Sequence, residues 1–124
     1  MRDNRPVNLD IGTMRLPITA WASISHRISG VVLFMASIGL LWALDLSLSS
    51  AEGFASLAAL LGTPAVRVLL WLLGTALAYH LFAGLRHLAM DFGVGETLRG
   101  GTLGAWLVIG LAVAASLLLG VALW

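Results

Sequence analysis

Hydrophobic positions along this chain gather into three long runs rather than into the short alternating patterns of a soluble fold. The runs cover about residues 20–46, 68–88 and 103–124. A helix needs roughly 20 mostly apolar residues to cross a hydrocarbon core about 30 Å thick, and each run is long enough. The pattern predicts an all-α integral membrane protein, a single domain of 124 residues with three transmembrane helices.

Composition agrees with the hydrophobic pattern and excludes other classes. The chain is 60% hydrophobic and 10% charged, whereas soluble domains carry about 25% charged residues. The net charge is only +1 and no basic run occurs, which excludes nucleic acid as the expected partner. Cysteine is absent, so neither a disulfide nor a thiolate metal ligand is expected. The first run is too long, and follows too much polar sequence, for a cleaved signal peptide.

The segments between the runs have different characters. Residues 1–19 are polar to mixed, with Pro6 and Pro17, and we expect an interfacial segment on the cytoplasmic surface before a helix starts near Ala20. The first loop has turn residues at both ends and an apolar middle, which is either a short interfacial helix or unordered. The second loop, residues 91–104, holds five glycines and is predicted to be a flexible connector.

Arginine placement predicts the orientation of the chain in the membrane. Basic residues precede the first run and flank the second loop: Arg2, Arg5, Arg15, Arg86 and Arg99. The first loop instead has Asp45 and Glu52, and no basic residue before Arg67. Cytoplasmic loops are enriched in basic residues, so the N-terminus is predicted to be cytoplasmic and the C-terminus periplasmic. Arg67 is the one residue against this orientation.

Two of the predicted helices carry a polar face. On the first, four residues recur at i, i+3, i+4 and i+7: Ser23, His26, Arg27 and Gly30. On the second, four residues recur at i, i+4, i+7 and i+11: His80, Gly84, His87 and Asp91. Such spacings place side chains on one side of a helix. Both faces lie toward the cytoplasmic end, and ionisable groups within a membrane indicate a functional site.

The second polar face suggests a haem b pocket. His80 lies near the middle of its run, where a neutral imidazole needs a partner such as a metal ion. Gly84, one turn away, leaves room for a planar macrocycle. His80 and His87 share one side of one helix, so they cannot approach an iron from opposite faces. His26 can be the second ligand only for a shallow haem on His87; a haem on His80 needs a histidine from another subunit.

Simpler interpretations of the same residues remain open at this point. A lone histidine in a transmembrane helix is more often an interhelical hydrogen-bonding residue than a haem ligand, so this interpretation of His80 stays open. Arg27 is a candidate to extend its guanidinium to the membrane surface. Ser23 can bond to its own helix. His87 and Asp91, at i and i+4, can form a hydrogen-bonded pair at the membrane surface.

Two ordered motifs carry a family resemblance. The first comprises Arg5-Pro6, Ile11, Ser23, His26-Arg27 and Ser29-Gly30. The second comprises His80, then Gly84 to Leu88, Met90-Asp91 and Gly93. Together, in order on the first two runs, they resemble the family of cytochrome b556 subunits of succinate dehydrogenase, the larger membrane anchors of bacterial respiratory complex II. The third run matches this family only in its general hydrophobicity.

The resemblance implies a complex in the bacterial inner membrane: a flavoprotein that oxidises succinate, an iron-sulfur subunit and two anchors that hold haem b and a ubiquinone site. His80 would be the axial iron ligand, and the second anchor would supply the other histidine. Ser23 and Arg27 would bind ubiquinone, and His26 with Arg27 would lie near the haem propionates. His87 and Asp91 are candidates for a proton relay. The chain has no flavin motif and no iron-sulfur ligands, so catalysis would belong to the complex.

Three alternatives stay beside this interpretation. One is the anchor of a fumarate reductase or another quinone-linked complex, since the sequence does not fix the direction of electron flow. Another is a small transporter or proton channel with His80, His87 and Asp91 as a relay, although residues 103–124 contain no ionisable side chain to continue it. The last is a structural assembly protein, which predicts no haem.

Overall fold

The structure, a computed structural model, describes residues 7, 9–10 and 12–124. It contains four helices: α1 (Ile18–Ser49), α2 (Ala51–Leu61), α3 (Pro64–Asp91) and α4 (Leu98–Leu123). No strand occurs in the described part of the chain. Three of the helices, α1, α3 and α4, are long and apolar enough to cross a membrane. The predicted all-α class with three spanning helices is therefore confirmed.

The long helices extend beyond the predicted spans. Residues 20–46 lie within α1, residues 68–88 lie within α3, and residues 103–123 lie within α4. α1 has 32 residues and α3 has 28, which at about 1.5 Å per residue exceeds a hydrocarbon thickness of about 30 Å. Both helices are therefore long enough for their ends to extend past the apolar layer.

Local sequence explains where the helices begin. Pro17, which cannot donate a backbone hydrogen bond, precedes α1, and Pro64 is the first residue of α3, a position that proline favours. Ser50 caps α2 by accepting a hydrogen bond from the Gly53 amide at 2.9 Å. Thr97 caps α4 in the same way. Hydroxyl caps of this kind satisfy amides that have no partner within the helix.

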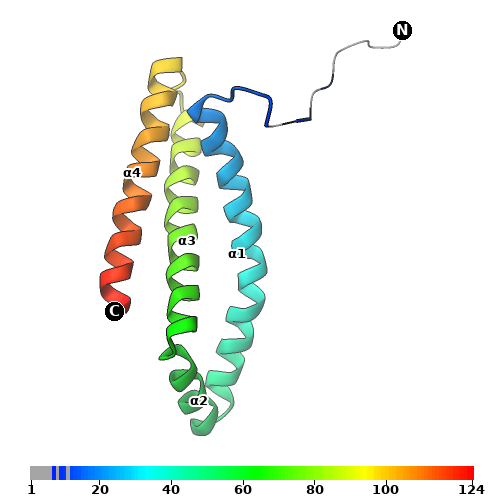
Figure 1. Cartoon of the computed structure of the whole chain (residues 1–124), viewed down its shortest axis with the longest axis vertical. Helices are drawn as coiled ribbons and strands as arrows, with labels where there is room; N and C mark the ends of the chain where they lie inside the picture. Colours follow the sequence, from blue (N-terminus) through cyan, green and yellow to red (C-terminus); the bar gives the residue numbers. More distant parts are fainter. Residues whose placement is uncertain (1–6, 8, 11) are drawn as a thin grey trace.

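The first loop is ordered as a helix. Its apolar middle forms α2, which confirms the helical alternative for this segment. The chain turns sharply at Ser50, and a Cβ atom at Gly53 would collide with the Leu46 carbonyl oxygen and with Ser49. Glycine at this position therefore allows α2 to start directly after α1 and to fold back toward α3, as Figure 1 shows.

The prediction of a flexible connector at residues 91–104 was wrong for most of that segment. Only residues 92–97 lie between α3 and α4, and three of the five glycines are helical: Gly100, Gly101 and Gly104. Gly93 and Gly95 do form the turn, with φ values of 84° and 78°, a region that side chains other than glycine rarely adopt. The helical glycines instead allow close packing, because a Cβ at Gly104 would lie 3.2 Å from Arg86 Nε.

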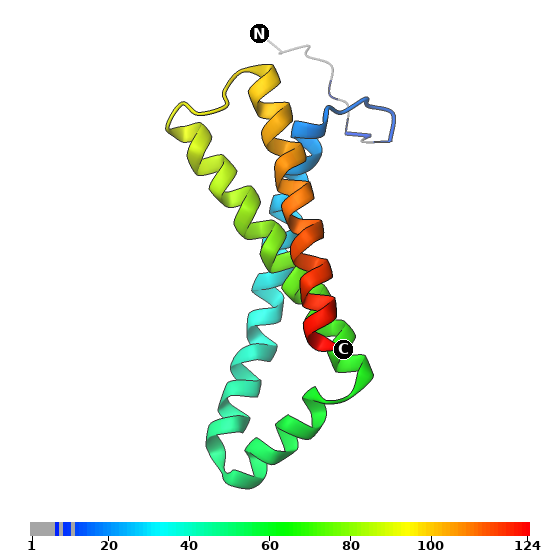
Figure 2. The ribbon, with the colours of Figure 1, turned by 90° about the vertical axis from the view of Figure 1, so that its left-hand side faces the viewer.

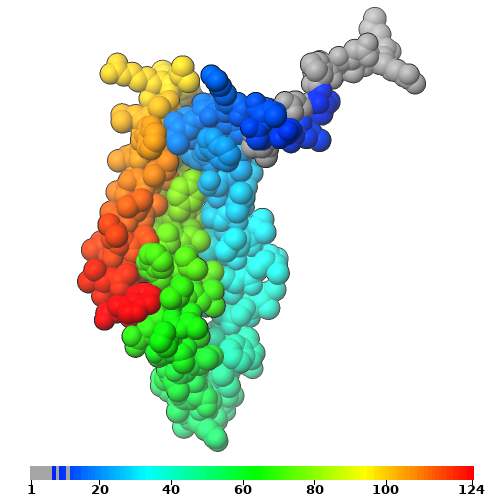
Figure 3. Space-filling model, viewed as in Figure 1, coloured from blue at the N-terminus to red at the C-terminus, as the bar shows by residue number. Residues whose placement is uncertain are grey.

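α3 is the central helix of the bundle. Figure 1 shows α1 on one side of it and α4 on the other, and Figure 2 shows α1 and α3 crossing each other. The lower end in Figure 3 is formed by α2 with the adjoining ends of α1 and α3, and α4 ends above it. Within the described residues the buried apolar side chains are small: Ala22, Ala83, Ala105, Val108 and Ala112.

The predicted orientation in the membrane stays a prediction. The end of the bundle formed by the start of α1, the end of α3 and the start of α4 (Figure 1) carries Arg15, Arg86 and Arg99. Arg67, at the start of α3, lies at the opposite end. Four residues used above lie outside the described residues: Arg2, Arg5, Pro6 and Ile11. Residues 12–17 turn aside from the axis of α1 (Figure 1).

Candidate functional site

The two polar faces predicted from sequence meet in one groove between α1 and α3. The groove has a volume of about 600 Å³. Nine residues line it: Ser23, His26, Arg27, His80, Leu81, Gly84, Leu85, His87 and Leu88. Every candidate ligand residue except Asp91 is among them. The groove is therefore the candidate site, and we refer to it below as the α1–α3 groove.

His80 contacts α1 through one of its two ring nitrogens, Nδ1. Its Nδ1 lies 3.0 Å from Ser29 Oγ and 3.2 Å from the His26 carbonyl oxygen. Nε2 has no hydrogen-bond partner within the described residues. His80 is thus an interhelical hydrogen-bonding residue through its Nδ1 atom, as the simpler interpretation predicted. It does not compete with metal binding, because a metal-ligating histidine normally donates its other ring N–H to a protein acceptor.

His26 packs against His80 face to face. The ring centroids are 4.2 Å apart and the ring planes differ by 19°. Two imidazoles that bind one iron from opposite sides each place a nitrogen about 2 Å from the metal, so their centroids must be much farther apart than two stacked rings. In this geometry His26 and His80 are not an axial pair, and among the described residues no three histidine, aspartate or glutamate side chains are arranged so that they could hold a metal ion together.

Two glycines, Gly30 and Gly84, lie next to the imidazole rings. A Cβ atom at Gly30 would lie 3.1 Å from Cε1 of His80, closer than side-chain contacts normally are, so the His80 ring reaches α1 only because Gly30 has no side chain. A Cβ at Gly84 would lie 3.5 Å from Nε2 of His26, which is an ordinary contact distance. The close approach of an imidazole therefore depends on Gly30, and the expectation that Gly84 leaves room for a planar macrocycle stays a prediction.

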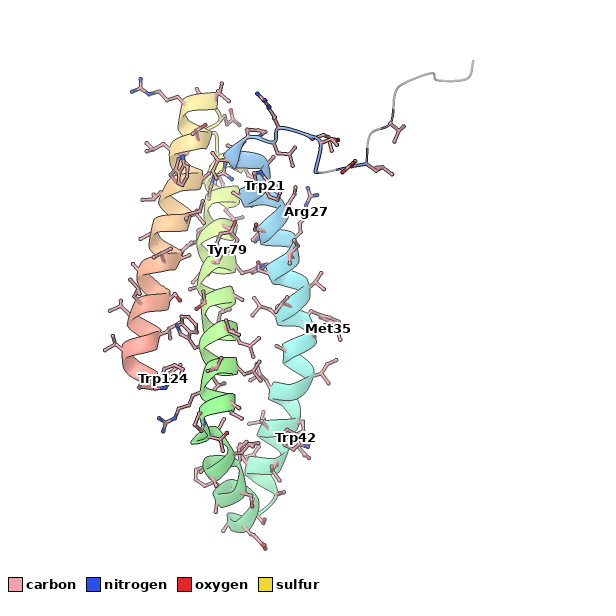
Figure 4. All side chains as sticks on the ribbon, in the orientation of Figure 1. Trp21, Arg27, Met35, Trp42, Tyr79 and Trp124 are labelled. Atoms are coloured by element: carbon pink, nitrogen blue, oxygen red, sulfur yellow. The ribbon has the colours of Figure 1, made fainter. Side chains whose placement is uncertain are left out.

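Ser23 and Arg27 lie on the α1 side of the groove. The Ser23 hydroxyl makes no hydrogen bond within the described residues, whereas Ser29 and Ser37 each donate to the carbonyl three residues earlier. The structure therefore contradicts the alternative that Ser23 only hydrogen-bonds to its own helix. Arg27 lines the groove and is exposed, and Figure 4 shows it on the outer side of α1. A free hydroxyl and a guanidinium therefore line the same groove.

His87 lines the α1–α3 groove, and Asp91 lies outside it. The His87 ring lies 5.1 Å from that of His26, at an angle of 46°, so three imidazoles gather in the α1–α3 groove. Asp91 is exposed at the last residue of α3 and does not line the groove. No hydrogen bond joins Asp91 to His87 in the described part of the chain, so the paired alternative is not present.

The structure also assigns contacts that the sequence did not reveal. Ser29 belongs to the first motif, but its contact with His80 depends on how α1 and α3 cross. Tyr79 adds a second link between these helices, since its hydroxyl donates to the Ala22 carbonyl at 2.8 Å. Arg86 faces away from the groove: its Nη2 donates to the Gly101 carbonyl of α4 at 3.1 Å, and its Nε is buried with no hydrogen-bond partner among the described residues. No motif in the sequence indicates these three contacts; the sequence shows only that hydrogen-bond donors and acceptors lie on the predicted helix faces.

These features define a class: an all-α membrane protein whose first two long helices form a groove lined by histidine, arginine and serine. The model of the succinate dehydrogenase/fumarate reductase transmembrane subunit family matches residues 1–119. The chain belongs to this family. Its sequence is 40% identical to the succinate dehydrogenase cytochrome b556 subunit of Coxiella burnetii, over the full length of both chains.

Two further relatives extend this similarity. The succinate dehydrogenase cytochrome b556 subunit of Paracoccus denitrificans is 37% identical, with 76% of this chain and 72% of the relative aligned. The corresponding subunit of Rickettsia felis is 32% identical, with 98% and 92% aligned. The resemblance inferred from the two motifs is thereby confirmed, and the chain is a membrane subunit of the succinate dehydrogenase/fumarate reductase type.

Proposed function

We propose that this chain is a membrane anchor of a bacterial succinate:ubiquinone oxidoreductase. In this proposal it binds haem b through His80 and contributes Ser23 and Arg27 to the site where ubiquinone is reduced. The observation that carries the proposal is the geometry of His80, which is hydrogen-bonded through Nδ1 and has no protein partner at Nε2 within the described residues. The relatives named cytochrome b556 support a haem protein.

The donor set of the α1–α3 groove fits haem b. Imidazole nitrogen is an established axial ligand of haem iron, and His80 presents one beside Gly84 in a groove of about 600 Å³. His26 is stacked on His80, and His87 lies on the same helix. The proposal therefore assigns the second axial histidine to a second anchor subunit. When bound, the haem would supply a one-electron carrier within the membrane.

Ser23 and Arg27 can stabilise the charge that develops on a ubiquinone carbonyl oxygen during reduction. Arg27 offers a permanent positive charge and several N–H donors, and Ser23 offers an unengaged hydroxyl. Such donors are most effective where water is excluded. Arg27 and His26 are also suited to the carboxylates of haem propionates. His87, in the groove, and Asp91, one turn beyond it, are proposed to relay protons from the cytoplasm.

The proposal implies partners and a location. An iron-sulfur subunit would dock at the end of the bundle that carries Arg15 and Arg99, and a flavoprotein would join through it. The membrane would be the bacterial inner membrane, with the N-terminus in the cytoplasm. A fumarate reductase anchor is the second candidate, because the family model includes both types. Assays of succinate oxidation and fumarate reduction by the purified complex separate the two.

Substitution of His80 tests the haem ligand. The chain is co-expressed with its partner subunits, and reduced-minus-oxidised spectra are compared for the wild type, His80→Ala and His87→Ala. We expect His80→Ala to abolish the low-spin haem spectrum and His87→Ala to retain it. An unchanged spectrum in His80→Ala would contradict the ligand assignment, and with it the central claim of the proposal.

Substitution of Arg27 tests the quinone site. We expect Arg27→Ala to reduce ubiquinone reduction at least 10-fold while succinate oxidation with a soluble artificial acceptor is unchanged, because only the first reaction uses this site. Arg67→Ala, which removes an arginine at the opposite end of the bundle, is the matched control and should preserve both activities. Equal loss of both activities in Arg27→Ala would exclude a direct role in quinone binding.

A further inference from the structure

The neighbours of His80 Nδ1 determine where its ring proton lies. Ser29 Oγ donates its single hydrogen to the His26 carbonyl oxygen at 2.8 Å, so it offers only lone pairs to His80. The other neighbour of Nδ1 is the same carbonyl oxygen, at 3.2 Å, which can only accept. Both groups that face Nδ1 are therefore acceptors, and a stable contact requires that Nδ1 carries the hydrogen.

This arrangement selects one of the two neutral forms of the imidazole. A neutral histidine carries one N–H, and the other ring nitrogen has a free lone pair. With the hydrogen on Nδ1, the lone pair lies on Nε2, which has no hydrogen-bond partner among the described residues. Metal coordination requires that lone pair, and the acceptor at the far nitrogen sets both the tautomer and the orientation of the ring.

We propose that Ser29 is a positioning residue for a haem ligand: it holds His80 as the Nδ1–H form and so directs the Nε2 lone pair toward the iron. The inference rests on the proposed function, since it takes His80 as the ligand. Ser29 is buried, with 8% of its surface exposed, so water does not compete for the contact. Gly30, the next residue, lets the same edge of the ring approach α1.

The His26 carbonyl limits how much Ser29 contributes. It is a second acceptor for the Nδ1 hydrogen and persists in any side-chain variant. Loss of a hydrogen-bond partner behind a metal ligand commonly lowers metal affinity 10- to 100-fold. Because one of two acceptors remains, we expect the effect of Ser29→Ala to lie near the lower end, about a 10-fold loss of haem affinity.

The chain provides a matched control on the same helix. Ser37 also donates to the carbonyl three residues earlier, at 2.6 Å from Phe34 O, but it makes no contact with a histidine ring in the described residues. Ser37→Ala therefore removes the same local hydrogen bond without touching His80. Ser29→Thr keeps a hydroxyl at the position and serves as the rescue variant.

The test uses the complete complex, co-expressed with its partner subunits, and measures haem per complex, the haem midpoint potential and the electron paramagnetic resonance spectrum of the ferric form. In Ser29→Ala we expect haem to dissociate about 10-fold more readily. We also expect a positive shift of the potential, because an imidazole without its acceptor donates less electron density to ferric iron. Ser37→Ala should match the wild type, and Ser29→Thr should restore haem retention and the potential.

The outcomes separate this inference from the proposed function. If Ser29→Ala matches Ser37→Ala and the wild type in haem retention, potential and resonance spectrum, Ser29 does not position the ligand, although His80 still binds iron. Equal haem loss in Ser29→Thr and Ser29→Ala also overturns the inference, because the hydroxyl would not be the determining group. A haem spectrum that persists in His80→Ala overturns the proposed function itself.

Discussion

α3 contacts α1 on one side and α4 on the other, and the two interfaces are built from different side chains. Toward α4, small residues permit close packing: α4 buries Gly101, Ala105, Val108 and Ala112. Toward α1, imidazoles occupy the contact and leave a groove of about 600 Å³ beside them. Close packing of small residues is the common way for membrane helices to associate, so the α3–α4 interface has the features of a structural contact.

The two interfaces also differ in how their polar groups are hydrogen-bonded. Toward α4, Trp71 Nε1 donates to the Ser116 carbonyl at 2.8 Å, and the Thr75 and Ser116 hydroxyls are 2.9 Å apart. Toward α1, the His80 contact leaves one ring nitrogen unused. These bonded groups stabilise the α3–α4 interface, where Arg86 Nε is buried without a partner among the described residues. His80, with its free ring nitrogen, instead lines a groove that can hold a ligand. The comparison therefore predicts that mutations in the α1–α3 interface change haem binding, whereas mutations in the α3–α4 interface change the stability of the bundle.

The largest expected effect is at Gly30, in the α1–α3 interface. A Cβ added there would lie 3.1 Å from Cε1 of His80, so the larger side chain of Gly30→Leu must displace the ring. We expect haem content of the complex to fall at least 10-fold, measured by the reduced-minus-oxidised spectrum. Gly39→Leu is the control on the same helix, because nothing lies within 4 Å of its Cβ position. Normal haem content in Gly30→Leu would show that this contact does not position His80.

A smaller and different effect is expected in the α3–α4 interface. Ala105 is fully buried, and Ala105→Leu should destabilise the packing by about 1–3 kcal/mol. We expect a lower melting temperature of the complex with an unchanged haem spectrum in the assembled fraction. Ala114→Leu makes the same change at an exposed position of α4 and should leave the melting temperature unchanged. Loss of haem from assembled Ala105→Leu complexes would contradict the separation of the two interfaces.

The smallest expected effects come from single interhelical hydrogen bonds. Trp71→Phe removes the bond to Ser116 O on α4, and Tyr79→Phe removes the bond to Ala22 O on α1, each 2.8 Å long. Such bonds contribute on average about 0.6 kcal/mol in membranes. We expect small decreases in thermal stability in both variants. The haem spectrum should distinguish the two variants, because only Tyr79→Phe, next to His80, should alter it detectably.

The sequence predicts the groove well because helical spacing alone places its residues. His26 and Arg27 recur with Ser23 on one face of α1, and His80 and His87 share a face of α3. On each helix, the spacing of these residues places their side chains on one face, near the same end of the bundle. Their meeting in one groove then required only that α1 and α3 are neighbours.

Contacts that depend on how two helices cross were not predictable. The Ser29 hydroxyl contacts His80 because of the way α1 crosses α3, and a single sequence does not encode that geometry in a readable pattern. The start of α4 was misplaced for a related reason. Glycines are poor helix formers, so Gly100, Gly101 and Gly104 indicated a loop, but their lack of side chains is what lets α4 pack against Arg86.

The small size of the buried core has a consequence for the isolated chain. Every buried apolar residue in the described sequence is an alanine or a valine, so few dispersion contacts join one helix to the next. Each helix, in contrast, satisfies its own backbone hydrogen bonds and persists in any apolar solvent. Harsh detergents should thus separate α1 from α3 while circular dichroism still reports full helicity.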